Sequence, residues 1–487
     1  MDVIVIGAGS TGSVVARRLA DAGHAVTVLE AGGEDTNPAI HDPSRMGELW
    51  HSPEDWDYVT VPQPSAAGRR LHLPRGKVLG GSHALNAMIW VRCAPADYDG
   101  WAARGNAGWA WDDLRPLFEQ AEALLSVTDD YSLDPIQESI VEAAVQEGLE
   151  RNPDYNGDHL DGVSQQQVTL RDGRRWNTYM AYLKPVRDRV DERTGCWVHR
   201  LLIEGAEARV VGVEFEQDGE VRRLRADEVV LCAGALDSPR ILLRSGIGPA
   251  DELRALGIEP VVDLPGVGRN LHDHLLSPVI FGTERPVGPP REGVSVTQSH
   301  LFWKSDQDLP VPDTQPIHFS VPMYQDGMTG PADGFSLMAG IVTPKARGSV
   351  RLSGPGPHDP LLIDLDALGH PDDVASLVAS VRQCRSIGAR PALAAWGATE
   401  IHPGPEVGDD ALEDYVRRTA ITYHHQVGTC AMGIGEDAVV SPTLRVHGVA
   451  GVRVADASVM PTVTTGNTNA PSVVIGEQAA RFLLAGA

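Results

Sequence analysis

Basic residues are scarce in this chain relative to acidic ones. Its 487 residues include 41 Lys and Arg against 66 Asp and Glu, which gives a formal net charge of -25. Nucleic acids and anionic lipid surfaces bind basic patches, so this balance argues against both as partners. Long apolar runs are also lacking, and none approaches the roughly 20 residues that a membrane-spanning helix needs. We therefore expect no nucleic-acid partner and no membrane span.

Cysteine is rare, and its spacing excludes the common metal motifs. The five cysteines are Cys93, Cys196, Cys232, Cys384 and Cys430. No CxxC pair and no Cys/His spacing typical of a metal site occurs, so we expect no metal and mostly buried, reduced thiols. The chain opens MDVIVIGAGS, without a basic segment or a cleavage site ahead of it. We expect a cytoplasmic protein on these grounds.

The first motif is a dinucleotide-binding signature at the start of the chain. An apolar run over residues 3–6 suits a buried parallel strand, and GxGxxG follows at Gly7, Gly9 and Gly12. The segment SVVARRLADAG then reads as an amphipathic helix, and a second strand is expected over residues 26–29. Glycines permit a tight turn beside a pyrophosphate, and the helix N-terminus offers N–H groups and partial positive charge. Ser10 and Thr11 belong to this turn.

An acidic residue stands at the end of the second predicted strand. Glu30 occupies the position from which a carboxylate binds ribose hydroxyls, with Ala31 after it. Such an acid disfavours the 2′-phosphate of NADP. The motif by itself leaves NAD and FAD open.

Four further stretches, in order along the chain, carry a family resemblance. They are LPRGKVLGGSHALNAMIWVRC (73–93), GALDSPRILLRSGIGP (234–249), GVGRNLHDHL (266–275) and GVRVADASVMPTVTTGNTNAPSVVIGEQAA (451–480). Together with the first motif they resemble the glucose–methanol–choline (GMC) oxidoreductases, nearest to the choline-dehydrogenase-like and hydroxymethylfurfural-oxidase-like branch. The resemblance runs from residue 3 to about residue 482. It implies FAD as the cofactor.

The resemblance also implies the fold class and a discontinuous domain organisation. We expect an α/β protein in which a Rossmann-type FAD-binding domain is joined to a substrate domain with a mixed or antiparallel sheet. A chain of 487 residues is long enough for two or three lobes. The expected segments are 1–130, 190–275 and 425–487 for FAD binding, 131–189 for a substrate cap, and 276–424 for the substrate domain.

Further FAD contacts follow from matching the family's motifs to this chain. The expected contacts beyond the first motif are Gly81, Ser82, Asn86, Ala87, Met88, Ile89, Val198, Asp456, Ala457, Asn467 and Thr468. Some members attach FAD through a histidine just before the loop asparagine, and Leu85 stands there in this chain. We therefore predict non-covalent FAD, with a bond from His83 as the minority alternative.

Two adjacent histidines near the C-terminus are the candidate catalytic centre. The family usually has an aromatic residue and then His-Pro-Val-Gly-Thr, and this chain has His424-His425-Gln426-Val427-Gly428-Thr429. His425 matches the catalytic base, and histidine has the pKa that alcohol deprotonation requires. Asn467 matches the family's second catalytic position and would hold the alkoxide oxygen. For His424 the alternatives of a substrate contact, tuning of the pKa of its neighbour and a structural role stay open.

The substrate is less well defined than the reaction. Choline-acting members carry a glutamate that pairs with the ammonium group, and Gln298 takes that position here, so choline is not expected. His300 lies nearby as a second substrate-pocket candidate, whereas Phe302 and Trp303 suit core packing. We expect oxidation of a primary alcohol, aromatic or furanic in the first instance, with electrons passed to O2 or another acceptor. A sugar or glycoside hydroxyl is the alternative, and a lyase or light-driven decarboxylase on the same scaffold is the further one.

Overall fold

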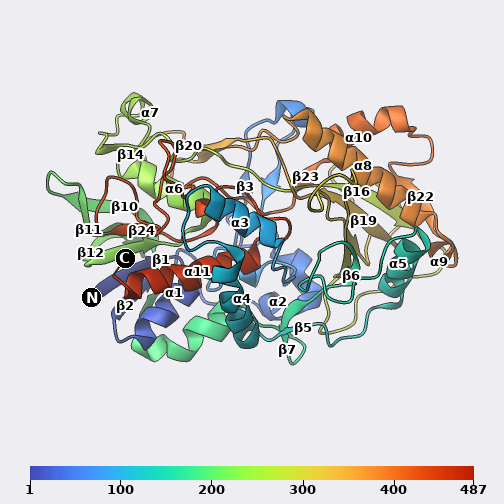
Figure 1. The fold of residues 1–487 in the computed structure, drawn as a ribbon, viewed down its shortest axis with the longest axis horizontal. Helices are drawn as coiled ribbons and strands as arrows, with labels where there is room; N and C mark the ends of the chain where they lie inside the picture. The colour runs from blue at the N-terminus through green and yellow to red at the C-terminus, as the bar shows by residue number, and fades with distance from the viewer. Residues whose placement is uncertain (487) are drawn as a thin grey trace.

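A parallel sheet of short strands forms one end of the molecule. The computed structural model describes residues 1–486. In spatial order the strands are β24 (Val452–Val454), β13 (Glu228–Leu231), β1 (Asp2–Ile6), β2 (Ala25–Leu29) and β9 (Asp191–Arg193). Every neighbouring pair is parallel, and the sheet joins segments from the start, the middle and the end of the chain (Figure 1). The two strands expected from the sequence over residues 3–6 and 26–29 are β1 and β2.

Two long helices pack on each other beside this sheet, and one of them also packs on β1 and β2. α1 (Ser10–Asp21) follows β1 directly and lies along α11 (Asn469–Leu484), the last helix of the chain. Their contact buries Val14 and Val15 of α1 completely. α4 (Trp111–Leu125) lies against α11 in turn. Full burial of these apolar side chains, at about 1.5–3 kcal/mol each, fixes α1 where its N-terminus faces the end of β1.

A small antiparallel sheet accompanies the parallel one. Its strands are β10 (Trp197–Glu204), β11 (Arg209–Gln217) and β12 (Glu220–Arg225). β11 contacts β13, and α6 (Gly234–Arg244) packs on β10. These contacts position the N-terminus of α6 beside the ends of β13 and β24.

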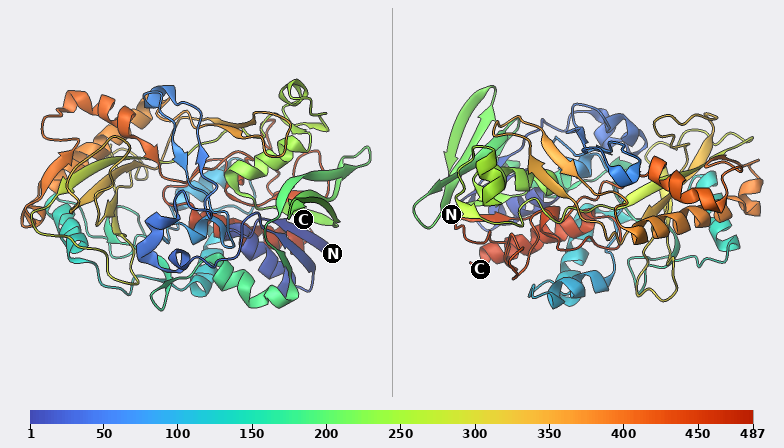
Figure 2. Two further views of the ribbon diagram at one scale, coloured as in Figure 1. Left: turned by 180° about the vertical axis from the view of Figure 1, so that it is seen from behind. Right: turned by 90° about the horizontal axis from the view of Figure 1, so that it is seen from above.

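The second lobe is built on a larger sheet at the opposite end of the long axis (Figures 1 and 2). In spatial order its main strands are β22 (Thr399–His402), β16 (Leu275–Gly282), β19 (Gly334–Ile341), β18 (Ile317–Phe319), β17 (Thr297–Phe302) and β6 (Gly162–Gln165). β23 (Ile421–Thr422) also pairs with β16. All these pairings are antiparallel, so of the two sheet types expected for the substrate domain the antiparallel one is present.

Side chains alternate between the two faces of this sheet. On β18, Ile317 and Phe319 point into a cavity between the lobes. His318 points the other way, where its Nδ1 lies 2.8 Å from Ser299 Oγ. That outer face is covered by α5 (Pro135–Gln146) and α8 (Pro371–Gly388). The period of two therefore decides which residues of each strand face the cavity.

The segment boundaries expected from the sequence stay predictions, although the packing bears on one of them. Residues 131–189 were expected to form a substrate cap. Within them, η4 (Tyr179–Leu183) packs on α1 and η5 (Lys184–Arg189) packs on β9, both in the first lobe. α5 and β6 of the same stretch belong to the second lobe.

Two further features concern the cysteines and the helices. All five cysteines are buried and none is paired within residues 1–486. Over the same residues, no helix combines the length and the apolar character that crossing a bilayer demands.

Candidate active site

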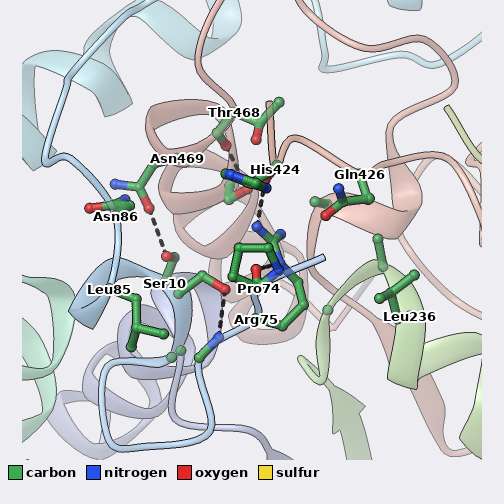
Figure 3. A pocket seen from close by; sticks show the side chains of 18 of the residues that line it. Ser10, Pro74, Arg75, Leu85, Asn86, Leu236, His424, Gln426, Thr468 and Asn469 are labelled. Atoms are coloured by element: carbon green, nitrogen blue, oxygen red, sulfur yellow. Dashed lines mark hydrogen bonds between the residues drawn. The ribbon is translucent and has the colours of Figure 1, made fainter. Parts of the chain in front are cut away.

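A cavity connects the two lobes. It begins at the ends of β1 and β2 and extends to the inner face of the second sheet. The N-termini of α1, α6 and α11 all open onto it, through Ser10, Gly234 and Asn469 respectively. Figure 3 shows this meeting point, with Ser10 and Asn469 at the left, His424 and Arg75 in the middle, and Gln426 and Leu236 at the right.

The glycines of the first motif are required by close backbone contacts. A Cβ on Gly7, whose φ is +99°, would lie 2.5 Å from the carbonyl oxygen of Cys232. A Cβ on Gly12 would lie 1.9 Å from the carbonyl oxygen of Gly7. A Cβ on Gly81 would lie 2.7 Å from Gly9 Cα, so the loop carrying Gly81 rests directly on the turn. Only glycine allows the three segments to converge at the start of α1.

Two buried carboxylates stand at the strand ends. Glu30 accepts the backbone N–H groups of Ala8 and Gly32, each at 2.8 Å. Its burial outweighs these hydrogen bonds and raises the pKa of its carboxyl to about 7. Asp456 accepts the N–H of Gly234 at 2.9 Å, and burial raises the pKa of its carboxyl as well. Both carboxylates line the cavity.

Most of the predicted cofactor contacts converge on this cavity. Those that line it are Gly7, Gly9, Ser10, Thr11, Glu30, Ala31, Gly81, Ser82, Asn86, Ala87, Ile89, Val198, Asp456, Ala457, Asn467 and Thr468. Gly12 and Met88 are not among the lining residues. Gly12 packs against the Gly7 carbonyl instead, and Met88 is buried with a φ of +63°.

The two substrate-pocket candidates on β17 lie away from the cavity. The Gln298 amide donates to Asp134 Oδ2 at 2.6 Å and to the Ser295 carbonyl at 2.9 Å. The His300 ring is buried against Tyr155, with ring centroids 4.4 Å apart. Neither residue is among those lining the cavity. Their strand, β17, pairs with β18 on the side away from β19 and so lies farther from the cavity. His424, the third candidate, does line it.

The adjacent histidines are separated by an unusual backbone turn. His424 has a φ of +67°, which sends the two rings in different directions. Its Nδ1 lies 2.7 Å from Thr422 Oγ1, and its ring meets Trp50 edge-on at 5.4 Å. Its carbonyl accepts from Arg75 Nη2 at 2.5 Å (Figure 3). Burial, with Arg75 nearby, lowers the pKa of the His424 ring to about 3.

The loop carrying His425 is anchored by one buried carboxylate. Asp273 Oδ1 accepts the backbone N–H of His425 at 2.7 Å, and its Oδ2 accepts from the Gln426 amide. Burial raises the pKa of the Asp273 carboxyl to about 7. Gln426 stands where the family usually has proline, and this hydrogen bond shows how the loop is held without it.

His425 meets a different partner at each ring nitrogen. Its Nε2 lies 3.2 Å from the Asn467 amide nitrogen, and its Nδ1 lies 2.9 Å from Nδ1 of His274. The ring stacks on Tyr423 at 4.6 Å between centroids. Burial is the main cause that lowers the pKa of His425 well below 6.5, and His274, His424 and Arg75 lower it further. The ring is therefore a neutral base at physiological pH.

Three residues of this arrangement had no role assigned from the sequence: Asp273, His274 and Gln315. The first two lie within the stretch GVGRNLHDHL, whose pair of histidines around an aspartate was the available signal. Gln315 carries no local signal, and its side chain reaches the site only because β18 and β19 fold beside the last loop. Its amide donates to Asn467 Oδ1 at 2.8 Å.

The parallel sheet, the glycine turn and the buried His–Asn pair define a dinucleotide-dependent oxidoreductase of two lobes. The chain belongs to the GMC oxidoreductase family, whose N-terminal model matches residues 1–276 and whose C-terminal model matches residues 344–476. The predictions of the family, of the fold class and of an FAD-dependent oxidoreductase are confirmed.

Similar proteins match over their whole length. An alcohol dehydrogenase [acceptor] of Pseudomonas putida is 36% identical over 99% of this chain and 95% of its own. An oxygen-dependent choline dehydrogenase of Rhizobium rhizogenes is 35% identical over the same shares. The crystal structure of pyridoxine 4-oxidase from Mesorbium loti superposes with a TM-score of 0.91 at 35% identity, covering 99% of this chain and 98% of that one.

The residues at the nucleotide end fit FAD. Asn469 Oδ1 accepts the Ser10 hydroxyl at 2.8 Å, which leaves the buried Asn469 Nδ2 without a protein partner. This unsatisfied donor lies where the N-termini of α1 and α11 meet, and a pyrophosphate oxygen is the kind of acceptor that both helix ends and the amide favour. Gly234 has no atoms within 4 Å of where its Cβ would be, so the α6 end leaves room as well.

Proposed function

We propose that this protein oxidises primary alcohols carried on an apolar body, aromatic or furanic, with His425 as the base and Asn467 as the oxygen ligand. Its family and its relatives make the chain an FAD-dependent alcohol oxidoreductase. What we propose is the class of substrate and the roles of His425 and Asn467. The observation that carries it is the composition of the cavity wall in front of His425.

That wall is apolar. Side chains on it from the second lobe and the neighbouring loops are Met46, Trp50, Ile89, Leu276, Ile317, Phe319, Met323, Met338, Ile421 and Tyr423. The carboxylates that line the cavity within residues 1–486 are Glu30, Asp237 and Asp456, and all three follow strands of the parallel sheet. Such a wall favours an uncharged, apolar body. It offers no anion for a quaternary ammonium group and few partners for the hydroxyls of a sugar, so the sugar alternative is disfavoured.

The relatives give partial support. One is named for choline and another for pyridoxine, which is a hydroxymethylated aromatic ring. In this chain Gln298 is tied to Asp134 behind the wall, so it supplies no counter-charge to a cationic substrate. The aromatic alcohol is therefore the better match.

The site residues divide the chemistry between them. The neutral Nε2 of His425 accepts the hydroxyl proton, and Asn467 Nδ2, 3.2 Å away, donates to the oxygen that becomes negative. The glycine turn, Glu30 and the helix N-termini would hold FAD, which would supply the hydride acceptor. The Nδ1–H of His425 points at His274 Nδ1, so the imidazolium formed by proton uptake keeps a hydrogen-bond acceptor on its far side.

The substrate is tested by anaerobic reduction of the purified holoenzyme in the dark. Benzyl alcohol and hydroxymethylfurfural should bleach the flavin absorbance, whereas choline and glucose should not. Bleaching by glucose or choline but not by the aromatic alcohols would contradict the proposal. A flavin that no alcohol reduces would favour the lyase or light-driven alternatives.

Re-admission of air to the reduced enzyme identifies the acceptor class. Fast recovery of the flavin bands with peroxide indicates O2, and slow recovery indicates another acceptor. The sequence-based expectation left this choice open, and the cytoplasmic location also stays a prediction.

We further propose that FAD is bound without a covalent bond. Leu85 lines the cavity at the family's attachment position. The His83 ring is held elsewhere, with its Nε2 3.0 Å from Thr169 Oγ1 and its Nδ1 accepting the Thr178 N–H at 3.3 Å. Acid precipitation should leave all the flavin in the supernatant, and a yellow pellet would contradict this.

A further inference from the structure

Gln315 is a buried glutamine directly behind the His425–Asn467 pair. It follows Thr314, which forms an isolated bridge to Trp303, and it precedes β18. Its side chain is fully buried and its Nε2 donates to Asn467 Oδ1 at 2.8 Å. We propose that Gln315 is a positioning residue that fixes the orientation of the Asn467 amide. The proposal rests on the proposed roles of His425 and Asn467.

An asparagine amide has two orientations that differ only in which end carries the donor. With Oδ1 toward Gln315, Asn467 presents Nδ2 to His425 Nε2 at 3.2 Å and to a substrate oxygen bound beside the two nitrogens. After a 180° flip, Oδ1 would face the His425 lone pair and the developing alkoxide. The same flip would set two N–H donors, of Asn467 and Gln315, against each other. While Gln315 keeps its Nε2 toward Asn467, this donor selects the orientation that stabilises the reacting oxygen.

The backbone of Gln315 is held by both neighbouring elements. Its N–H donates to the Gly340 carbonyl on β19 at 3.0 Å, and its carbonyl accepts from the Tyr423 hydroxyl at 3.4 Å. A Cβ on Gly340 would lie 2.6 Å from that carbonyl, so the strand allows this approach only with glycine. Tyr423 in turn stacks on the His425 ring. Gln315 is therefore fixed relative to both members of the pair.

Only the donor half of the Gln315 amide is used. Its Oε1 is buried and has no hydrogen-bond partner within residues 1–486. A side chain that merely filled space would not need the donor, and methionine has nearly the same shape without it. A carboxyl group at this position donates when protonated and cannot donate when ionised.

The test compares Q315M and Q315E in the holoenzyme. Q315M should lower the rate constant for flavin reduction by benzyl alcohol about tenfold at every pH, the effect of one lost buried hydrogen bond to a reacting group. Q315E should reduce nearly as fast as wild type at low pH and lose about tenfold or more as the introduced carboxyl ionises. Burial raises the pKa of the Glu30 and Asp273 carboxyls to about 7, so the reduction rate of Q315E should fall near neutral pH.

A second readout does not depend on turnover. The tertiary alcohol 2-phenyl-2-propanol has no carbinol hydrogen to give up, and its binding can be followed by flavin difference spectra. In Q315E its Kd should rise over the same pH range in which the reduction rate falls. In the wild type its Kd should not change over that range. The other titratable groups of this network are His425, Tyr423, Cys93 and, behind His425, His274 and Asp273, and all are common to both proteins.

Controls separate the outcomes. Q166M removes another fully buried glutamine, whose amide donates to Thr297 Oγ1 and the Ser299 carbonyl, and it should keep the wild-type rate. FAD content and the far-UV spectrum establish that each variant is folded. If the flavin is reduced equally fast in Q315M and Q315E at all pH values, and neither the rate nor the Kd of Q315E changes with pH, the positioning role is wrong. If H425Q also keeps the wild-type rate, the proposed function itself has failed.

Discussion

At the residue scale, His425 is the group on which the proposed chemistry depends. Removing it should leave a folded flavoprotein that alcohols reduce poorly. For His425→Gln we expect the rate constant of flavin reduction to fall about 10²–10⁴-fold, the range for loss of a general base. Anaerobic stopped-flow absorbance measures it, with FAD content as the check on folding. A wild-type rate in this variant would remove His425 from the mechanism.

His424→Gln is the matched variant at the adjacent position. Its ring contacts Thr422 and Trp50 rather than Asn467, so we expect a change of less than about tenfold. The larger loss should fall on the residue whose Nε2 faces Asn467. A greater loss at His424 than at His425 would exchange the two roles.

The pH dependence of reduction follows from burial of the same ring. The pKa of His425 is lowered well below 6.5, so the competent neutral form persists as pH falls through that value. The reduction rate at saturating alcohol should therefore be flat from alkaline pH down past 6.5 and decline only below it. A decline centred at or above 6.5 that persists in Asp273→Asn would contradict this.

Asp273 is the one neighbour that complicates this profile. The pKa of its carboxyl is about 7, and it accepts the His425 N–H. If the reduction rate changes near neutral pH and this change disappears in Asp273→Asn, it is caused by titration of that carboxyl. A change that persists in the variant is caused by titration of His425.

At the element scale, the start of α1 depends on the absence of a side chain at Gly12. A Cβ there would lie 1.9 Å from the Gly7 carbonyl oxygen. Gly12→Ala should therefore destabilise the protein by at least about 2 kcal/mol and reduce its FAD content. Urea unfolding followed by fluorescence, together with the flavin-to-protein absorbance ratio, measures both.

Gly100 provides the matched helical control. It lies inside α3 (Pro95–Ala103), and its Cβ would meet nothing within 4 Å. Gly100→Ala should stabilise the protein by about 0.5–1 kcal/mol, because alanine has the higher helix propensity. If both substitutions have the same sign, the close contact at Gly12 is not what matters.

At the scale of the whole molecule, the cofactor site joins elements that are remote in sequence. The N-termini of α1, α6 and α11 and the loop carrying Gly81 all line one cavity. Bound FAD therefore stabilises the native state, by about 2.7 kcal/mol when free FAD is a hundredfold above its Kd. Stripping FAD should lower Tm by several degrees, and adding FAD back should restore it. An apoprotein with an unchanged Tm would contradict this linkage.

The glycine turn and the catalytic loop were open to prediction because their chemistry is local. GxGxxG followed by a helix pattern determines a tight turn by itself, and β1, α1 and β2 have the order expected. The choice of His425 and Asn467 rested on family motifs of the same short range. Gln298 and His300 could not be placed this way, because the face and the depth of a strand depend on its neighbours in the sheet.

The sequence by itself determined the dinucleotide turn and the family and offered His425 as a candidate base, since each depends on residues close together in the chain. Only the tertiary structure decided what surrounds that base. His274, Asp273 and Gln315 are separated from it by at least about a hundred residues. The first two contact His425 and Gln315 contacts Asn467 because β16, β18 and β19 fold beside the last loop. The apolar wall on which the proposed substrate class rests has the same origin. It is assembled from alternate residues of several strands, and strand pairing, rather than local sequence, brings them to one face.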